Sequence, residues 1–215
     1  MNEFEDNNYI EKTYEQLIEE YSAKIEKEPQ NAENYNNRGI EYVEAGEYEK
    51  AVTDHTKAIE LSPTDGDSYN CRGIAYEELG KYESAIEDYN KAIELDKTQG
   101  HYYYNRGNTY YKMGEHYKAV EDFKKEIELN PEVTDNYSDL GEIYYKLKRY
   151  KEALDCLNVA IDELNSQNYE AFFWRSKVHM VHTQDLEQAK KDLEKARELN
   201  AEGVKALEKA DKGCF

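Results

Sequence analysis

One histidine pair and a glycine–lysine pattern are the first places where this 215-residue chain could carry chemistry. His179 and His182 lie three residues apart and could bind a metal from one helix face, but no clear third ligand lies nearby. The stretch Gly73–Lys81 ends in Gly-Lys, as part of a phosphate-binding loop does. That loop has four residues between its glycines, and Ser or Thr follows the lysine. Here six residues separate the glycines, and Tyr82 follows the lysine. Neither pattern predicts a catalytic or metal site.

Acidic side chains dominate the composition, because 47 Asp and Glu residues outweigh 28 Lys and Arg residues and give a formal net charge of −19. Such a chain repels nucleic acid and anionic membranes, which bind basic surfaces. The carboxylates fall at regular polar positions, and no pair is singled out by apolar surroundings as a general acid and base would be. We therefore predict that the protein is not an enzyme, needs no cofactor and binds neither nucleic acid nor membrane.

The cysteines and the first residues bear on the cellular compartment. Cys71, Cys156 and Cys214 are an odd, scattered set without a CxxC spacing, which predicts free thiols. No apolar run is long enough to cross a membrane. The first residues are acidic and lack the basic start and apolar middle of a signal peptide. These features predict a cytoplasmic protein.

A repeated pairing of arginine with aspartate is the most regular feature of the polar residues. In three pairs the aspartate follows sixteen residues after the arginine, and in the fourth seventeen: Arg38 and Asp54, Arg72 and Asp88, Arg106 and Asp122, Arg175 and Asp192. Where one more pair would fall, Leu140 and Cys156 replace both charges together. A planar guanidinium can bind a carboxylate through two hydrogen bonds. We predict four structural ion pairs; the alternative is separate charges exposed to solvent.

Such pairs require two antiparallel helices, and the apolar residues predict hairpins of this kind. Between Ser68 and Leu79, apolar or small residues recur at spacings of three and four, which is the helical period. Gly80 then ends the helix, because glycine readily takes the left-handed conformation that closes helix ends. A second amphipathic stretch covers Tyr82–Leu95. The arginine and the aspartate lie equally far from the turn glycine, so they face each other.

The same pattern returns every 34 residues. Its columns are Tyr35, Tyr69, Tyr103 and Tyr137; Gly39, Gly73, Gly107 and Gly141; Tyr42, Tyr76, Tyr110 and Tyr144; and Ala51, Ala85, Ala119 and Ala153. A fixed period of this length is typical of a solenoid. A single hairpin leaves one apolar face bare, so each hairpin must stack on the next.

The order of aromatic, small and turn residues, with Pro63 and Pro131 near the ends of repeats, resembles the tetratricopeptide repeat (TPR) over roughly residues 32–202. The resemblance implies an all-α, right-handed α-solenoid of five helix-turn-helix repeats that binds proteins or peptides. We expect an acidic lead and an N-terminal capping helix in residues 1–31, repeats at 32–65, 66–99, 100–133, 134–167 and 168–202, and a C-terminal capping helix in 203–215. The fifth repeat is degenerate, because its turn is one residue longer and has no glycine.

In TPR proteins the inner face of the first helices lines a groove that holds peptides or partner helices. The resemblance implies this role for Asn36, Asn37, Ile40, Glu44, Asn70, Ile74, Glu78, Tyr104, Asn105, Asn108, Lys112, Phe173 and Trp174. Asparagine offers a donor and an acceptor to an extended main chain, and the two last aromatic residues are expected to form an anchor pocket. The alternative is that several Asn and Tyr side chains are only solvated surface.

The distribution of charge predicts the kind of partner. Residues 1–99 carry a net charge of −15 and residues 100–215 carry −4, so the N-terminal part of the groove favours a basic segment. Family members that bind acidic chaperone tails use Lys, Arg and Asn there, whereas the first two repeats offer acidic, amide or apolar residues. We expect an adaptor or a chaperone-like holder. The alternative is a structural unit whose copies assemble through the terminal helices.

Overall fold

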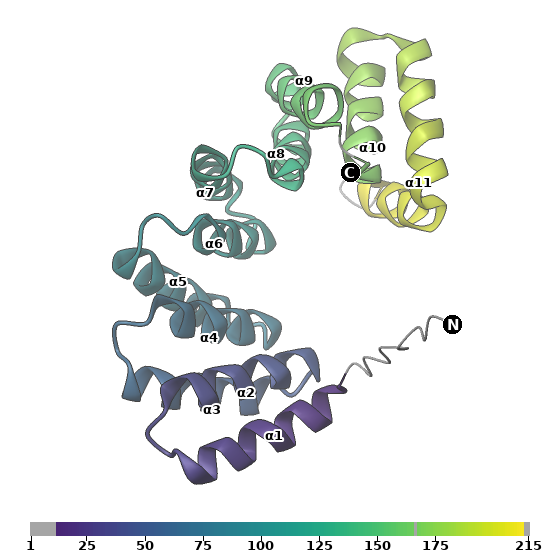
Figure 1. Cartoon of the computed structure of the whole chain (residues 1–215). Coiled ribbons are helices and arrows are strands. Elements are labelled where there is room, and N and C mark those ends of the chain that lie inside the picture. The colour runs from purple at the N-terminus through teal and green to yellow at the C-terminus, as the bar shows by residue number, and fades with distance from the viewer. Residues whose placement is uncertain (1–11, 166, 213–215) are drawn as a thin grey trace, which may run out of the picture. The chain divides into compact units, whose positions relative to one another are not determined.

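The computed structural model describes residues 12–165 and 167–212, which form helices joined by short turns (Figure 1). The chain divides into two compact units, Met1–Lys97 and Thr98–Phe215. Within the described ranges there is no strand, and consecutive helices pair as the all-α prediction requires. The predicted acidic lead, the part of the expected N-terminal capping helix before Lys12, and Cys214 lie outside the described residues.

The first unit contains one single helix and two helical hairpins. Its helices are α1 (Tyr14–Lys27), α2 (Ala32–Glu44), α3 (Tyr48–Leu61), α4 (Gly66–Glu78) and α5 (Tyr82–Leu95). Asn31 and Asp65 cap the first helix of each hairpin by accepting a backbone N–H. Gly46 and Gly80 close the hairpin turns with φ of 73° and 70°, a conformation that other residues rarely adopt. The turn glycines therefore do what the sequence pattern predicted.

The second unit continues the same alternation. Its helices are α6 (Gly100–Lys112), α7 (His116–Leu129), α8 (Thr134–Lys146), α9 (Tyr150–Asn158), α10 (Tyr169–Val178) and α11 (Leu186–Lys212), with π-helical turns at Val159–Glu163 and His179–Thr183. Asn200 is non-helical, with φ −157° and ψ 91°, and divides α11 into two helices. The longer turn of the last hairpin is accommodated by the second π-helical turn and by Gln184, which takes the left-handed φ of 57°.

In the first four hairpins, a glycine of the first helix makes a close contact with a large side chain of the second helix. A Cβ atom on Gly73 would lie 2.6 Å from Cε1 of Tyr89, and one on Gly141 would lie 2.5 Å from Cγ of Leu157. The repeated alanines beside these contacts are fully buried. The helices can therefore approach closely because one side chain is missing and the facing one fills the space.

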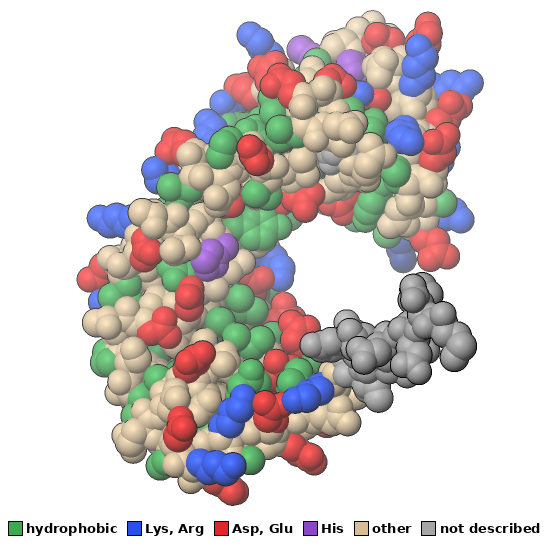
Figure 2. Space-filling view, in the orientation of Figure 1, with side chains coloured by type: hydrophobic (Ala, Val, Ile, Leu, Met, Phe, Trp, Pro, Cys, Tyr) green, Lys and Arg blue, Asp and Glu red, His purple; other side chains and the backbone are tan. Residues whose placement is uncertain are grey.

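Helix α1 packs against α2 and lies in the register of a second helix, 34 residues before α3. None of its side chains is buried. Lys24 stands 34 residues before Ala58, which is fully buried, and pairs with Glu20 at 2.9 Å. Figure 2 shows charged side chains of both signs over this helix. The capping role of this helix stays a prediction.

Candidate functional site

The structure brings each predicted arginine and aspartate together across its hairpin. Arg72 donates from Nε and Nη2 to the two carboxylate oxygens of Asp88, at 2.8 and 2.7 Å. The corresponding distances are 2.7 and 2.8 Å for Arg38–Asp54, 2.8 and 2.6 Å for Arg106–Asp122, and 2.9 and 2.9 Å for Arg175–Asp192. The Asp88 side chain is 8% exposed, and its hydrogen bonds raise the pKa of Arg72. These are partly buried bidentate pairs rather than separate surface charges.

Arg38 and Arg72 also hold the helix that precedes their own, which the sequence reading missed. Nη1 of Arg38 donates to Ser22 Oγ at 3.0 Å, and Nη1 of Arg72 donates to Thr56 Oγ1 at 3.1 Å. Both acceptors lie sixteen residues before the arginine. Lys124 occupies that place before Leu140, so the acceptor and the arginine change together. This joint change within the chain could have revealed the hydrogen bond from the arginine to the preceding helix.

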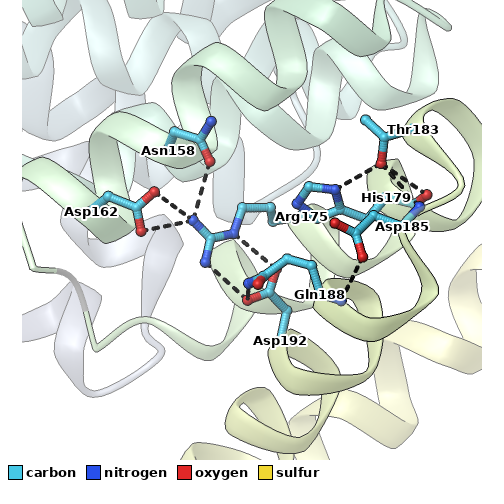
Figure 3. Close-up of polar contacts among 8 residues, drawn as sticks. All are labelled: Asn158, Asp162, Arg175, His179, Thr183, Asp185, Gln188 and Asp192. Carbon is cyan, nitrogen blue, oxygen red and sulfur yellow. Dashed lines mark hydrogen bonds and ion pairs between the residues drawn. The ribbon is translucent and has the colours of Figure 1, made fainter.

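The most extensive of these networks surrounds Arg175 (Figure 3). Its Nη1 contacts Asn158 Oδ1 at 3.1 Å and both carboxylate oxygens of Asp162 at 2.9 Å, while Asp192 accepts from its other nitrogens. Gln188 Nε2 adds a 2.9 Å hydrogen bond to Asp192. Arg175 therefore ties α10 to α11 and to the end of the preceding hairpin. Nearby, His179 Nδ1 contacts Thr183 Oγ1 at 2.9 Å.

In the first unit, the residues predicted to line the groove differ in their accessibility. Ile40, Glu44 and Glu78 are exposed, and the side chains of Asn36, Asn37 and Ile74 are half-buried. Asn70 is only 5% exposed, so its prediction as an accessible groove residue is wrong. Helix α4 packs against α2, α3 and α5, so a place on the first helix of a hairpin does not by itself leave a side chain accessible.

In the second unit, the predicted groove residues border two small cavities. Tyr104 lines one of about 210 Å³ together with Glu126 and Asp135. Asn108 lines another of about 50 Å³ beside Asp139 and Glu142. Asn105 is half-buried and Lys112 is exposed.

Asp139, on the second of these cavities, has an unusual proton affinity. Burial raises its pKa to about 7, and the neighbouring carboxylates of Glu142, Glu170 and Asp135 act in the same direction. Of the two carboxyl groups in this cavity, Glu142 already pairs with Lys146 at 2.7 Å, and a positive charge near Asp139 would favour its ionised form.

The structure corrects the prediction that Phe173 and Trp174 form an accessible anchor pocket. Phe173 and Trp174 are 1% and 2% exposed, so they belong to the core of the second unit. Two contacts cover them. The ring of Tyr145 lies 5.3 Å from that of Trp174 between centroids, and the last part of α11 packs on α10, where Lys177 binds Asp211 at 2.5 Å. The aromatic pair was assigned to the groove from its place on the first helix, but the part of α11 after Asn200, which packs on α10, comes later in the chain.

Three family models match consecutive parts of this architecture. A TPR repeat model matches residues 41–80 and 76–114, and two tetratricopeptide repeat models match residues 102–133 and 134–162. The chain belongs to the tetratricopeptide-repeat family. No curated protein sequence gives a significant match.

Solved structures share the TPR fold at low sequence identity. YrrB, described as a TPR protein with an unusual peptide-binding site, superposes with a TM-score of 0.69 at 23% identity and covers 90% of this chain and 99% of its own. MamA 41-end from Desulfovibrio magneticus RS-1 gives 0.70 at 20% identity, covering 80% and 96%. The APC/C hetero-tetramer Cut9–Hcn1 gives 0.74 at 18% identity, covering 94% of this chain and 40% of that one. At these identities the likeness shows the fold alone.

Two further findings bear on chemistry and membranes. Among the described residues of this TPR chain, no three His, Cys, Asp or Glu side chains are grouped so that they could hold a metal ion. None of the helices in the described ranges is long and apolar enough to span a membrane. Cys71 and Cys156 are free thiols, as predicted, and burial raises the pKa of both, to about 12 and about 11.

His55 is a buried polar residue that the sequence reading of this TPR chain missed. It fills the contact against Gly39 in the first hairpin and is 0% exposed. Its Nδ1 lies 2.8 Å from Asn36 Oδ1, whereas its Nε2 is buried and finds no hydrogen-bond partner in residues 12–165 and 167–212. Burial lowers the pKa of the imidazole to about 4, and the charge of Arg72 acts in the same direction. The equivalent residues in the next three repeats are Tyr89, Phe123 and Leu157. A histidine in this column is therefore the sequence feature that could have revealed the buried imidazole.

Stability should depend on pH through His55. The unfolded chain takes up a proton as the pH falls through 6.5, whereas the folded protein resists protonation until about pH 4. Stability is therefore full above pH 6.5 and is lost as the pH falls toward 4, by about 1–2 kcal/mol between pH 7 and pH 5. We expect His55→Phe to lack this loss. Urea unfolding of the wild type and of His55→Phe at pH 7 and pH 5 measures this loss of stability. The contribution of Asp139 is the same in both proteins, so it cancels when the two are compared. An equal pH dependence of the two proteins would contradict the role of His55.

Proposed function

We propose that this TPR chain is a non-enzymatic scaffold that holds a basic, extended segment of a partner protein on the inner face of its first helices. The observation that carries the proposal is the exposure of Glu44 and Glu78, which are 34 residues apart and occupy the same place on α2 and α4. Ile40, 37% exposed, supplies apolar contact beside them. The peptide-binding site named for YrrB, which has the same fold, also supports a peptide partner.

The polar groups of this surface suit a main chain with cationic side chains. Asn36 and Asn37 carry amide donors and acceptors that can bind peptide groups. Carboxylates at Glu44 and Glu78 attract Lys or Arg side chains, and the charge of −15 on residues 1–99 steers a basic segment toward this unit. In the second unit, Tyr104, Asn105 and Asn108 offer comparable groups, with Asp139 as the acidic neighbour, while Lys112 adds a cation at the end of α6. We place this interaction in the cytoplasm.

Selection from a displayed library of random twelve-residue peptides tests the proposal. We expect the selected peptides to be enriched in Lys and Arg, and their affinity for the chain to fall as salt screens the charges. Peptides enriched in Asp or Glu, or an affinity that is independent of salt, would contradict a basic partner. A failure to select any peptide above background would contradict the groove function itself.

Reversing the two groove carboxylates should weaken binding of the selected peptides. Glu44→Lys combined with Glu78→Lys removes two attractions and adds two repulsions on an exposed surface, and we expect a loss of roughly tenfold in affinity. The matched control is Glu49→Lys combined with Glu83→Lys, which makes the same change in charge on exposed positions of the second helices, α3 and α5. Isothermal titration should then show a clearly smaller loss. Equal losses in both variants would mean that only net charge matters.

A further inference from the structure

One position in every regular hairpin faces the contact glycine of the first helix. Gly73 meets Tyr89, Gly107 meets Phe123, Gly141 meets Leu157, and Gly39 meets His55. In three of the four hairpins an aromatic ring or an aliphatic side chain fills this space. The first hairpin alone places an imidazole there, and the ring has no exposed surface. The exception needs a reason, because Phe123 shows that a purely apolar ring fits the same place.

Burial of the His55 imidazole is unfavourable for the stability of the core. Nδ1 lies 2.8 Å from Asn36 Oδ1, but Nε2 is buried without a hydrogen-bond partner among the described residues. A buried polar atom without a partner destabilises a fold, whereas phenylalanine would bury only carbon. Residues that break a local packing rule without a gain in packing are expected at functional positions. The gain should therefore lie in the one group that His55 contacts, the amide of Asn36.

The pairing fixes which way the amide points. A buried N–H without an acceptor is rarer than a buried acceptor without a donor, so the proton belongs on Nδ1 and the bare lone pair on Nε2. Nδ1–H then donates to Asn36 Oδ1, and the NH₂ group of Asn36 is directed away from the ring. Asn36 is half-buried on α2, and its Nδ2 has no partner within the described part of the chain. Two N–H donors are thus directed away from the ring on a half-buried side chain, one turn before Ile40.

We propose that His55 is a positioning residue, which orients Asn36 so that its NH₂ group donates to a main-chain carbonyl oxygen of the bound segment. The inference rests on the proposed function, because Asn36 belongs to the surface assigned there. Recognition of a carbonyl oxygen is independent of the partner's side chains. Hydrogen bonding to the main chain and charge selection by Glu44 and Glu78 are then separate tasks of the same surface.

The ligand-free protein tests the geometry without any partner. Long-range ¹H–¹⁵N spectra of the histidine rings distinguish the two neutral tautomers and follow protonation, with His55→Phe identifying the signal. We expect the proton of His55 on Nδ1 and no protonation above pH 5. A proton on Nε2, or titration near pH 6.5, would overturn the inference whatever the chain binds.

Binding of an acetylated and amidated (Ala-Lys)₆ peptide tests the consequence. We expect His55→Phe and Asn36→Ala each to weaken binding about three- to tenfold, the range that one hydrogen bond contributes. The double variant should bind no more weakly than the weaker single variant, because both changes remove the same oriented donor. His55→Phe should nevertheless be at least as stable to urea as the wild type at pH 7. A structural role alone would not weaken binding while stability is kept.

Tyr89→Phe is the matched control, since it replaces a polar ring by phenylalanine at the same place in the second hairpin. We expect it to leave the affinity unchanged. The inference is wrong if His55→Phe binds the peptide like the wild type, or if the two single losses multiply. If the wild-type protein does not bind this peptide, the basic partner of the proposed function is wrong, and the ring spectra alone decide whether His55 orients Asn36.

Discussion

Replacing Asp88 by asparagine is expected to destabilise the protein by about 3–5 kcal/mol, the usual result of removing one partner from a buried ion pair. Asp88 is 8% exposed and accepts two hydrogen bonds from Arg72, which also donates to Thr56. Asparagine can accept only one of the two, and the guanidinium charge stays between the helices without its counter-charge. Urea unfolding measures the loss, and the whole curve should be compared because repeat arrays can unfold in stages.

The fourth hairpin supplies the control for this prediction. It carries Leu140 and Cys156 in place of arginine and aspartate, and Leu140 is buried at 2% exposed. The double variant Arg72→Leu with Asp88→Cys copies that solution and leaves no buried charge, so it should be clearly more stable than Asp88→Asn. An Asp88→Asn curve that coincides with the wild type would show that the pair contributes little. A double variant as unstable as the single one would show that the loss does not come from an unpaired charge.

Gly73→Ala is expected to cost about 2–3 kcal/mol, although alanine normally favours helices. The new Cβ atom would lie 2.6 Å from Cε1 of Tyr89, whose side chain is fully buried. Either the two helices separate or the ring leaves its position, and both disturb the hairpin. Thermal or urea unfolding measures the effect.

Gly107→Ala in the third hairpin is the matched comparison. There the nearest atoms to an added Cβ are Asp122 Cβ at 3.3 Å and Phe123 Cε1 at 3.4 Å, so a shift of a few tenths of an ångström is enough. The helical preference of alanine, worth roughly 0.5–1 kcal/mol, should nearly offset this shift. We expect a change close to zero. Equal effects at the two glycines would contradict the packing difference between the hairpins.

Much of this protein was determined by the sequence alone, because its interactions repeat locally. The 34-residue period, the turn glycines and the spacing of Arg72 and Asp88 all lie within one hairpin, where the distance to the turn fixes which residues face each other. The matched loss of both charges at Leu140 and Cys156 was readable for the same reason. Such features need only helical geometry and a known turn.

What only the tertiary structure decided are contacts between neighbouring hairpins and between facing side chains. Phe173 and Trp174 were predicted to be exposed from their place on the first helix of the fifth repeat. They lie in the core because α11 and Tyr145 cover them. Asn70 is buried although it stands on the predicted groove face, and Arg72 reaches Thr56 on the preceding helix. Burial depends on what packs above a residue, and a helical pattern defines only the direction in which its side chain points. The same limit hid His55, whose partner became evident only when Asn36 was placed beside it.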